Sequence, residues 1–436
     1  MGAKAIRWLY QELPALVAKG ILTQESSDKL RQHYGAVKSV SKTRTVLIIC
    51  AVLGALLIGL GIILLLAHNW EQFSRFTRAV LSFLPLVLGQ ALVFWTLAYR
   101  PQSPAFKEGS ATFLSLMVGA SIALVSQTYN IPGDTGTFIL SWMLLSVPLV
   151  YLLQASLPAA IYLVGITSWA GSYWDNPSMA VLFWPLAAIV VPHFIWALRQ
   201  ELYTLRLAIL SLVAMVCVSF AASFSLGKTW PGSWVIIFPS LYAVFYSLGC
   251  RQFSGIFTSW QRPLRIFGGI ALFVLAFQFT FRYVWQYADL DFSQIARDIG
   301  ASSAWPDHLI TLAILATALL LFYDNLKSKK WNVALFGAVP FLAIAGYFLK
   351  EEAITLPLLI FNLFLFVLSI SRIMFGIRSN SLGLINSGML ILALLIIARF
   401  FDSDIGFIIK GLVFIAVGSG FLITNAVLAR RLGGAQ

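Results

Sequence analysis

The residues of this chain that can do chemistry are few, and no arrangement typical of an enzyme is found among them. The sequence contains no GxxxxGK[ST] phosphate loop, no HExxH zinc motif and no GxSxG nucleophile elbow, and its four histidines are far apart. The cysteines, Cys50, Cys217 and Cys250, are isolated and odd in number, so we expect them in the apolar core rather than in a disulfide or metal site. We therefore predict no catalytic residue, no metal site and no cofactor.

The chemistry that remains is that of polar groups set next to long apolar segments. Such groups are costly at membrane depth and tend to mark functional sites. The clusters are His68–Glu71 with Arg75 and Arg78, Gln127–Asp134, Arg399–Asp404 with Lys410, and Glu351–Glu352. The candidate substrate-binding residues selected from them are His68, Asn69, Trp70, Gln127, Tyr129, Asp134, Arg399, Asp402 and Lys410.

Each cluster also has an ordinary structural explanation. The His68 cluster resembles an interfacial cap with a Trp anchor, although His68 can titrate near neutral pH. Gln127 lies in apolar surroundings and needs a hydrogen-bond partner. The Pro-Gly-Asp step that ends at Asp134 is either a turn whose Asp caps the next helix or an unwound binding segment of the kind used by transporters.

The charges of the third cluster are also open to two interpretations. Arg399 and Asp402 are close enough to pair if one helix continues through both, and Lys410 needs an acid or a path to the surface. These groups form either a structural ionic network or an anion or proton site. Glu351 and Glu352 are explained most simply as acids at a helix N-terminus.

The composition decides the class of protein that must position these residues. Of the 436 residues, 59% are hydrophobic and only 11% are charged. A soluble globular protein has about 45–50% apolar and about 25% charged residues. These values exclude a soluble enzyme and a disordered chain, and they predict an all-α, polytopic bundle of transmembrane helices.

The apolar runs give the expected elements, since a bilayer-spanning helix needs about 20 mostly apolar residues. We predict about fourteen spans, within a range of twelve to fourteen, because the fourth and fifth are separated only by Gln154–Leu157 and the tenth is short. The predicted spans are 45–67, 79–99, 109–129, 137–153, 158–173, 178–198, 205–225, 233–249, 263–282, 308–323, 331–349, 353–375, 381–399 and 405–428.

The distribution of charge predicts the orientation of these spans. With this topology, 22 of the 30 Lys and Arg residues lie on the same side as the N-terminus, whereas 11 of the 17 acids lie on the other side. By the positive-inside rule both termini are cytoplasmic. The net charge of +13 is therefore an orientation signal. It indicates membrane lipids as partners and not nucleic acid.

Residues 1–44 differ from the transmembrane domain, 45–436, because they are polar enough to fold in water. Apolar residues recur at helical spacing between Ile6 and Val17, Gly20 is a stop signal, and Thr23 is an expected N-cap for a second helix. We predict a short helical hairpin, which is either a tether on the membrane or a docking module for a cytoplasmic protein partner.

At these residues the sequence resembles a large family of predicted bacterial inner-membrane proteins defined only by a domain of unknown function. The resemblance lies in the Gly-Ile-Leu-Thr-Gln-Glu step at Gly20–Glu25, the Ala-x-Asn-Trp step at Ala67–Trp70, the Gln-x-Tyr-x-x-Pro-Gly-Asp turn at Gln127–Asp134 with Trp142 after it, and the Arg-Phe-Phe-Asp stretch at Arg399–Asp402. It covers the first third and both ends of the chain, while residues 155–380 match only in hydropathy. It implies a multi-pass protein of the bacterial inner membrane and brings no activity with it.

The leading functional hypothesis is a protein that transports, flips or exports a small or amphiphilic substrate through a polar site facing the periplasm. In its single-site form, the first, third, thirteenth and fourteenth spans must meet. One alternative is a non-catalytic assembly or sensory factor that recruits a partner through residues 1–44. A second alternative is a membrane-embedded transferase with Asp402 or Asp134 as its base, although we lean against an enzyme.

Overall fold

The computed structural model describes residues 9, 12–14, 16–17, 20–34, 70–200, 205–227, 232–252, 262–286, 305–350, 352–379, 381–402, 415 and 418–419. The regular secondary structure of these residues is helical, with no strand. Contacts between residues divide the chain into two units, Met1–Arg78 and Ala79–Gln436. The predicted span 45–67 and most of the predicted span 405–428 lie outside the described residues, as do His68, Asn69, Lys410, Glu351 and the side chain of Asp402.

The first unit contains α2 (Gln24–Tyr34) and the short 3₁₀ helix η1 (Trp70–Gln72). The predicted cap of α2 is confirmed, because the Ser26 amide donates to Thr23 Oγ1 at 3.2 Å. Gly20 has a φ of +70°, a left-handed conformation that suits glycine and ends a preceding helical turn.

The remaining helices follow one another along the chain. They are α4 (Arg75–Tyr99), α5 (Pro104–Tyr129), α6 (Thr135–Leu152), α7 (Ser156–Gly171), α8 (Pro177–Ala180), α9 (Phe183–Ala188), α10 (Val191–Gln200), α11 (Leu205–Ser225), α12 (Trp234–Gln252), α13 (Pro263–Gln278), α14 (Arg282–Gln286), α16 (Trp305–Lys327), α17 (Trp331–Gly337), α18 (Val339–Leu349), α19 (Thr355–Arg378) and α20 (Leu382–Asp402).

Ten segments of the described chain are long and apolar enough to cross a membrane. They are α4, α5, α6, α11, α12, α16, α19, most of α20, and the composite segments Pro177–Arg199 and Trp331–Leu349. Two further apolar helices, α7 and α13, are shorter. Each span predicted between residues 79 and 399 thus coincides with helical structure, while the total of about fourteen stays a prediction.

Two predicted spans are interrupted, and proline explains the interruptions. Proline has no amide hydrogen and its ring collides with the carbonyl four residues earlier, so a helix breaks on its N-terminal side. Pro185 and Pro192 follow the breaks that separate α8, α9 and α10, and Pro340 follows the break at Ala338 between α17 and α18. The span predicted at 178–198 coincides with the apolar segment Pro177–Arg199, which these breaks divide into three helices.

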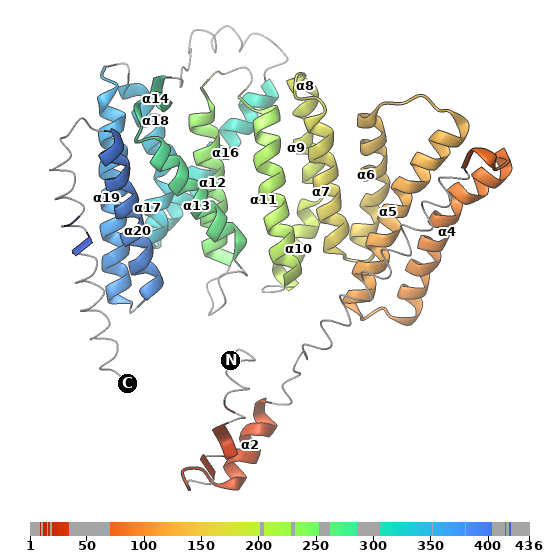
Figure 1. The fold of residues 1–436 in the computed structure, drawn as a ribbon, viewed down its shortest axis with the longest axis horizontal. Coiled ribbons are helices and arrows are strands. Elements are labelled where there is room, and N and C mark those ends of the chain that lie inside the picture. Colours follow the sequence, from red (N-terminus) through yellow and green to blue (C-terminus); the bar gives the residue numbers. More distant parts are fainter. Residues whose placement is uncertain are drawn as a thin grey trace. The chain divides into compact units, whose positions relative to one another are not determined.

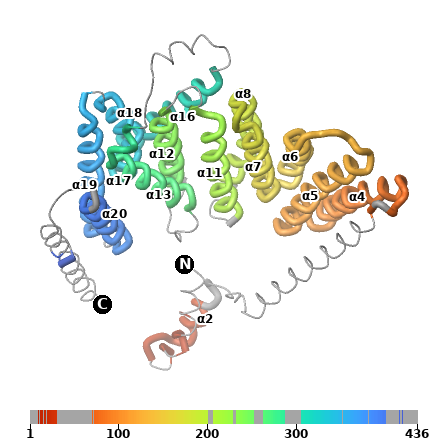
Figure 2. The backbone as a smooth tube through the Cα atoms, turned by 45° about the horizontal axis from the view of Figure 1, so that its top comes forward, coloured from red at the N-terminus to blue at the C-terminus, as the bar shows by residue number. Residues whose placement is uncertain are grey.

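Within the second unit, helices that follow one another in sequence pack side by side (Figures 1 and 2). α5 contacts α6, α6 contacts α7, α7 contacts α11, and a later group is formed by α12, α13, α16, α18, α19 and α20. One apolar core surrounds Tyr162 and Phe183, and another surrounds Phe279, Trp285 and Phe361.

Many large apolar side chains point away from these cores. Phe94, Leu320 and Leu359 are 74%, 68% and 66% exposed. Exposed apolar side chains on consecutive long helices are what a lipid environment requires, because in water they would form an extended apolar patch. The fold is therefore that of a helical bundle whose outer surface contacts lipid.

Candidate functional site

A groove of about 910 Å³ lies between α4, α5 and α6, within the size range of small-molecule sites. Phe83, Ile131 and Leu145 line it and are still 50%, 53% and 61% exposed, so the groove is open at its surface. Its other apolar lining residues are Leu86, Val118, Ile122, Ala123, Val125, Pro132 and Phe138. Its polar lining residues are Gln90, Ser121, Ser126, Gln127, Asp134, Thr135, Thr137 and Ser141.

Close helix contacts hold the walls of the groove in place. A Cβ atom on Gly89 of α4 would lie 2.9 Å from the side chain of Leu114 on α5. A Cβ atom on Gly119 of α5 would lie 2.5 Å from the indole of Trp142 on α6. Trp142 also donates its indole hydrogen to the Ser115 carbonyl at 2.6 Å. α6 is thus packed on α5, α4 approaches α5 closely at Gly89, and the groove is the space left between the three helices.

The loop between α5 and α6 forms the polar end of the groove. Asn130 caps α5 in a left-handed conformation, with φ of +48°, and the Ser126 hydroxyl donates to the Ile131 carbonyl at 3.1 Å. Asp134 caps α6, because its carboxylate accepts the Thr137 amide at 2.8 Å and the Thr137 hydroxyl at 2.7 Å. The prediction that this turn ends in a capping Asp is confirmed.

The capping bonds also define the charge of Asp134. The amide and then the hydroxyl of Thr137 hold the pKa of this exposed carboxyl below its ordinary value of 3.8. Asp134 is therefore ionised at neutral pH and is a poor proton acceptor there. This environment does not favour the use of Asp134 as the base of a transferase.

Some polar side chains in the groove lack partners. The Gln127 side chain is exposed and lines the groove, whereas the sequence predicted apolar surroundings for it. Gln90, which lies in the middle of α4, is also exposed and lines the groove. Neither amide hydrogen-bonds to another described residue, and the Ser121 hydroxyl, only 4% exposed, also has no such partner. An amide or hydroxyl without a partner in an apolar medium costs roughly 1–3 kcal/mol, so this groove is suited to polar groups of a ligand.

The structure places the other predicted site residues elsewhere. Tyr129 is the last residue of α5, is exposed and does not line the groove. Trp70 is buried in the first unit. Arg399 near the end of α20 donates to Thr280 Oγ1 at 3.2 Å and lies 4.9 Å from the centre of the Phe281 ring. Of the described candidates, Gln127 and Asp134 are the ones that line one cavity.

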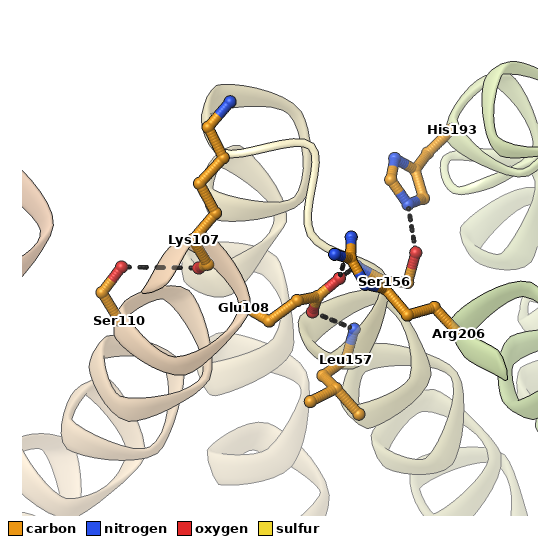
Figure 3. A network of polar contacts seen from close by, with 7 residues as sticks. All are labelled: Lys107, Glu108, Ser110, Ser156, Leu157, His193 and Arg206. Carbon is orange, nitrogen blue, oxygen red and sulfur yellow. Dashed lines mark hydrogen bonds and ion pairs between the residues drawn. The ribbon is translucent and has the colours of Figure 1, made fainter. Parts of the chain in front are cut away.

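Sequence inspection missed a second polar cluster, which surrounds Glu108 (Figure 3). The buried Glu108 carboxylate accepts the backbone amides of Ser156 and Leu157, both at 2.8 Å, at the first turn of α7. Arg206 of α11 lies 3.5 Å from the same carboxylate. An acid just inside a helix begun by proline was the available signal, but its partners are far away in the sequence.

The Glu108 cluster connects several helices. Ser156 Oγ lies 3.4 Å from His193 Nε2 of α10, and the His193 ring stacks on Trp196. Because the first amides of a helix have no partner within it, a carboxylate at this position completes the helix and complements its dipole. We assign this cluster a structural role, bracing α5 against α7 and α11. No group of three or more His, Cys, Asp or Glu suited to a metal ion occurs within the described ranges.

Residues 14–159 match the model of a family described as "Predicted membrane protein (DUF2157)". This confirms the family resemblance, and the matched range contains α4, α5 and α6, with the whole lining of the groove, together with Glu108 and Trp142. Neither the comparison with curated proteins nor the comparison with solved structures gave a match. The chain is thus a multi-pass membrane protein whose apolar helices contact lipid, and the family description assigns no activity.

Proposed function

We propose that the protein binds an amphiphilic molecule in the groove between α4, α5 and α6 and moves it across the membrane, as a transporter, flippase or exporter does. The observation that carries this proposal is a set of polar side chains, Gln90, Ser121 and Gln127, that have no hydrogen-bond partner among the described residues and line a groove that is otherwise mostly apolar. Ligand sites are typically apolar concavities with a few placed polar groups.

The two ends of the groove suggest the shape of the ligand. Gln127 and Asp134 lie at the α5–α6 loop, where a polar head can hydrogen-bond. Leu86 and Val118 line the part that runs along the helices, where an apolar chain is favoured. Because Asp134 is ionised, a head that donates hydrogen bonds, neutral or cationic, fits better than an anionic head.

The orientation belongs to the same proposal. With both termini cytoplasmic in a bacterial inner membrane, the α5–α6 loop faces the periplasm. The groove then opens beside the outer leaflet of the membrane. A molecule that arrives from the inner leaflet, or leaves towards the periplasm, passes this loop.

A lipid-translocation assay tests the proposal. The full chain is reconstituted in vesicles containing phosphatidylethanolamine with a fluorescent acyl chain, and the label exposed to an external quencher is followed with time. We expect faster exchange between leaflets than in protein-free vesicles. The Gln90→Leu and Gln127→Leu variants should each slow it about threefold to tenfold, as expected for one lost hydrogen bond.

The matched control is Asn362→Leu. Asn362 is also an amide within a predicted span, but it lies in α19 and donates to the Leu358 carbonyl of its own helix at 2.7 Å. This substitution should leave the exchange rate unchanged. A wild-type rate equal to that of protein-free vesicles would overturn the transport proposal. Equal slowing by all three substitutions would show that the groove is not the transport site.

An adaptor role is the second candidate, favoured by the first unit. Residues 1–78 form a unit of their own, and α2 within it exposes Glu25 and Lys29 to solvent as an ion pair. Deletion of residues 1–40 separates the two functions. If the protein is a transporter, the deletion variant should exchange lipid in vesicles as fast as the intact chain. If it is an adaptor, the deletion should abolish its effect in cells, and even the intact chain should show no exchange in vesicles.

A further inference from the structure

A second cavity lies among later helices and carries positive charge. Its volume is about 280 Å³, and its lining includes Tyr246 of α12, Arg265 of α13, and Arg372 of α19. The same three residues line a neighbouring cavity of about 70 Å³. The two arginines therefore stand at one small space between packed helices.

Arg372 is held in place by neighbours from other helices. Its Nε donates to Ser387 Oγ of α20 at 2.9 Å, and its guanidinium lies 5.4 Å from the centre of the Phe336 ring. Ser387 in turn donates to the Leu384 carbonyl at 2.8 Å. Tyr246, which lines the same cavity, also interacts with the Arg372 guanidinium. A guanidinium has five N–H donors, so donors beyond these contacts can still face an anion in the cavity.

The two cations have no carboxylate to balance them among the described residues. The ion pairs there are Lys29–Glu25, Arg206–Glu108 and Arg251–Asp324, and none includes Arg265 or Arg372. Arg265 instead acts on Arg372 as a like charge. Two uncompensated cations at membrane depth are costly, so this cavity favours an anionic group between them.

The position of the cavity along the helices indicates where the anion comes from. Arg372 is six residues, roughly 9 Å, from the end of α19, and Ser387 is five residues, about 7.5 Å, from the start of α20. Because the hydrocarbon core of a bilayer is about 30 Å thick, both backbone positions lie less than about 10 Å inside its edge, and a long arginine side chain can reach from there toward the lipid phosphates. Loops at the same end are basic, with Arg251, Lys327 and Arg378 in the last turns of α12, α16 and α19.

The apolar side of the cavity extends away from the charges. Ile266, Ile270 and Phe273 lie along α13 over seven residues, about 10 Å, in the direction of the bilayer centre. Leu390 of α20 faces the same cavity and is 60% exposed, while Ile270 is 53% exposed. An acyl chain can therefore lie along this surface while its phosphate is at the arginines.

We propose that this cavity is a binding site for an anionic phospholipid, with the phosphate between Arg265 and Arg372 and one acyl chain along Ile270 and Leu390. The site is separate from the groove between α4, α5 and α6, and it selects the opposite head charge. Basic pockets between transmembrane helices commonly hold anionic lipid heads.

Native mass spectrometry of the full chain in detergent tests the proposal. The protein is titrated with phosphatidylglycerol, with phosphatidylcholine, and with inorganic phosphate as a competitor. We expect phosphatidylglycerol to bind more tightly than phosphatidylcholine. The Arg265→Gln and Arg372→Gln substitutions should each weaken its binding about fivefold, and both together about 25-fold.

Two variants keep the test decisive. Arg265 makes no described hydrogen bond, so Arg265→Gln is informative even if Arg372→Gln fails to fold. Arg378→Gln removes an exposed cation at the same end that lines neither cavity, and it should leave the affinity unchanged. Equal binding of both lipids, wild-type affinity in Arg265→Gln, or displacement of the lipid by inorganic phosphate would each overturn the lipid assignment.

Discussion

At the scale of single residues, the buried carboxylate of Glu108 connects three of the described helices. Glu108 satisfies the free amides at the start of α7 and pairs with Arg206 of α11. The exposed pair of Lys29 and Glu25, although shorter at 2.7 Å, lies within one helix in contact with water. Burial, and not the distance between the charged atoms, therefore decides which pair matters for stability.

The first prediction follows from this difference. Glu108→Ala leaves two helix amides without their acceptor and removes the carboxylate beside the Arg206 guanidinium, and we expect a loss of about 3–5 kcal/mol in unfolding free energy. Glu25→Ala should cost at most about 0.5 kcal/mol. Thermal unfolding of both variants in detergent measures the difference. Equal losses would show that the Glu108 cluster does not brace the bundle.

The second prediction concerns pH. Because the pKa of Asp134 is lower in the folded chain than its ordinary value of 3.8, the ionised carboxylate stabilises the fold above about pH 4. This contribution is lost as the pH falls through the lower, folded-state pKa. Asp134→Asn keeps an oxygen acceptor for the cap but does not titrate. The stability advantage of wild type over this variant should shrink between pH 6 and pH 3, and an advantage independent of pH would contradict the account.

At the scale of helices, glycine sets the distance between neighbours. In α5, a Cβ on Gly119 would lie 2.5 Å from the Trp142 indole, whereas a Cβ on Gly109 meets nothing within 4 Å. We predict that Gly119→Ala displaces Trp142 and lowers stability by about 1–3 kcal/mol. Gly109→Ala should be neutral or stabilising by up to about 1 kcal/mol, because alanine is the better helix former. Unfolding of the two variants checks this, and similar stabilities would refute the close contact.

The positions of the long helices could largely be predicted from the sequence, whereas the breaks within them could not. Hydropathy located helical structure in every predicted span from 79–99 to 381–399, because long apolar runs have few alternatives in a membrane. It did not show the breaks before Pro185 and Pro340, since hydropathy averages over a window and ignores the missing amide hydrogen. Local chemistry selected Gln127 and Asp134 as candidate site residues, and both line the groove.

The rest of the site depends on which helices are neighbours. The position of Gln90 in the groove follows from α4 packing against α5 at Gly89. The partners of Glu108 are 48 and 49 residues away. No local pattern contains that pairing, so it could not be found from one sequence.

At the scale of the whole molecule, the charges define two kinds of helix end. Arg251 and Asp324 pair between α12 and α16 at a basic end, near Lys327 and Lys329. The loop with Gly133 and Asp134 contains no basic residue. If the positive-inside rule sets the orientation, these two regions lie on opposite sides of the membrane.

The fourth prediction tests this orientation in a background without the three native cysteines. In intact bacterial cells whose outer membrane admits the reagent, an impermeant maleimide should label Gly133→Cys. It should label Ser328→Cys only after the inner membrane is opened. Labelling of both positions from the same side would contradict the proposed topology.

Photo-cross-linking with a lipid tests directly whether the groove between α4, α5 and α6 binds an amphiphile. Phosphatidylethanolamine carrying a photoreactive diazirine in its acyl chain is added to membranes containing the full chain, and the labelled residues are identified by mass spectrometry. We expect adducts to be concentrated on the lining of the groove, at Phe83, Leu86 and Val118. These adducts should be lost in the double variant that combines Gln90→Leu and Gln127→Leu. Labelling of Leu359 and Leu363, exposed side chains of α19, should be unaffected. Adducts spread equally over the groove and α19 would contradict a specific site for an amphiphile.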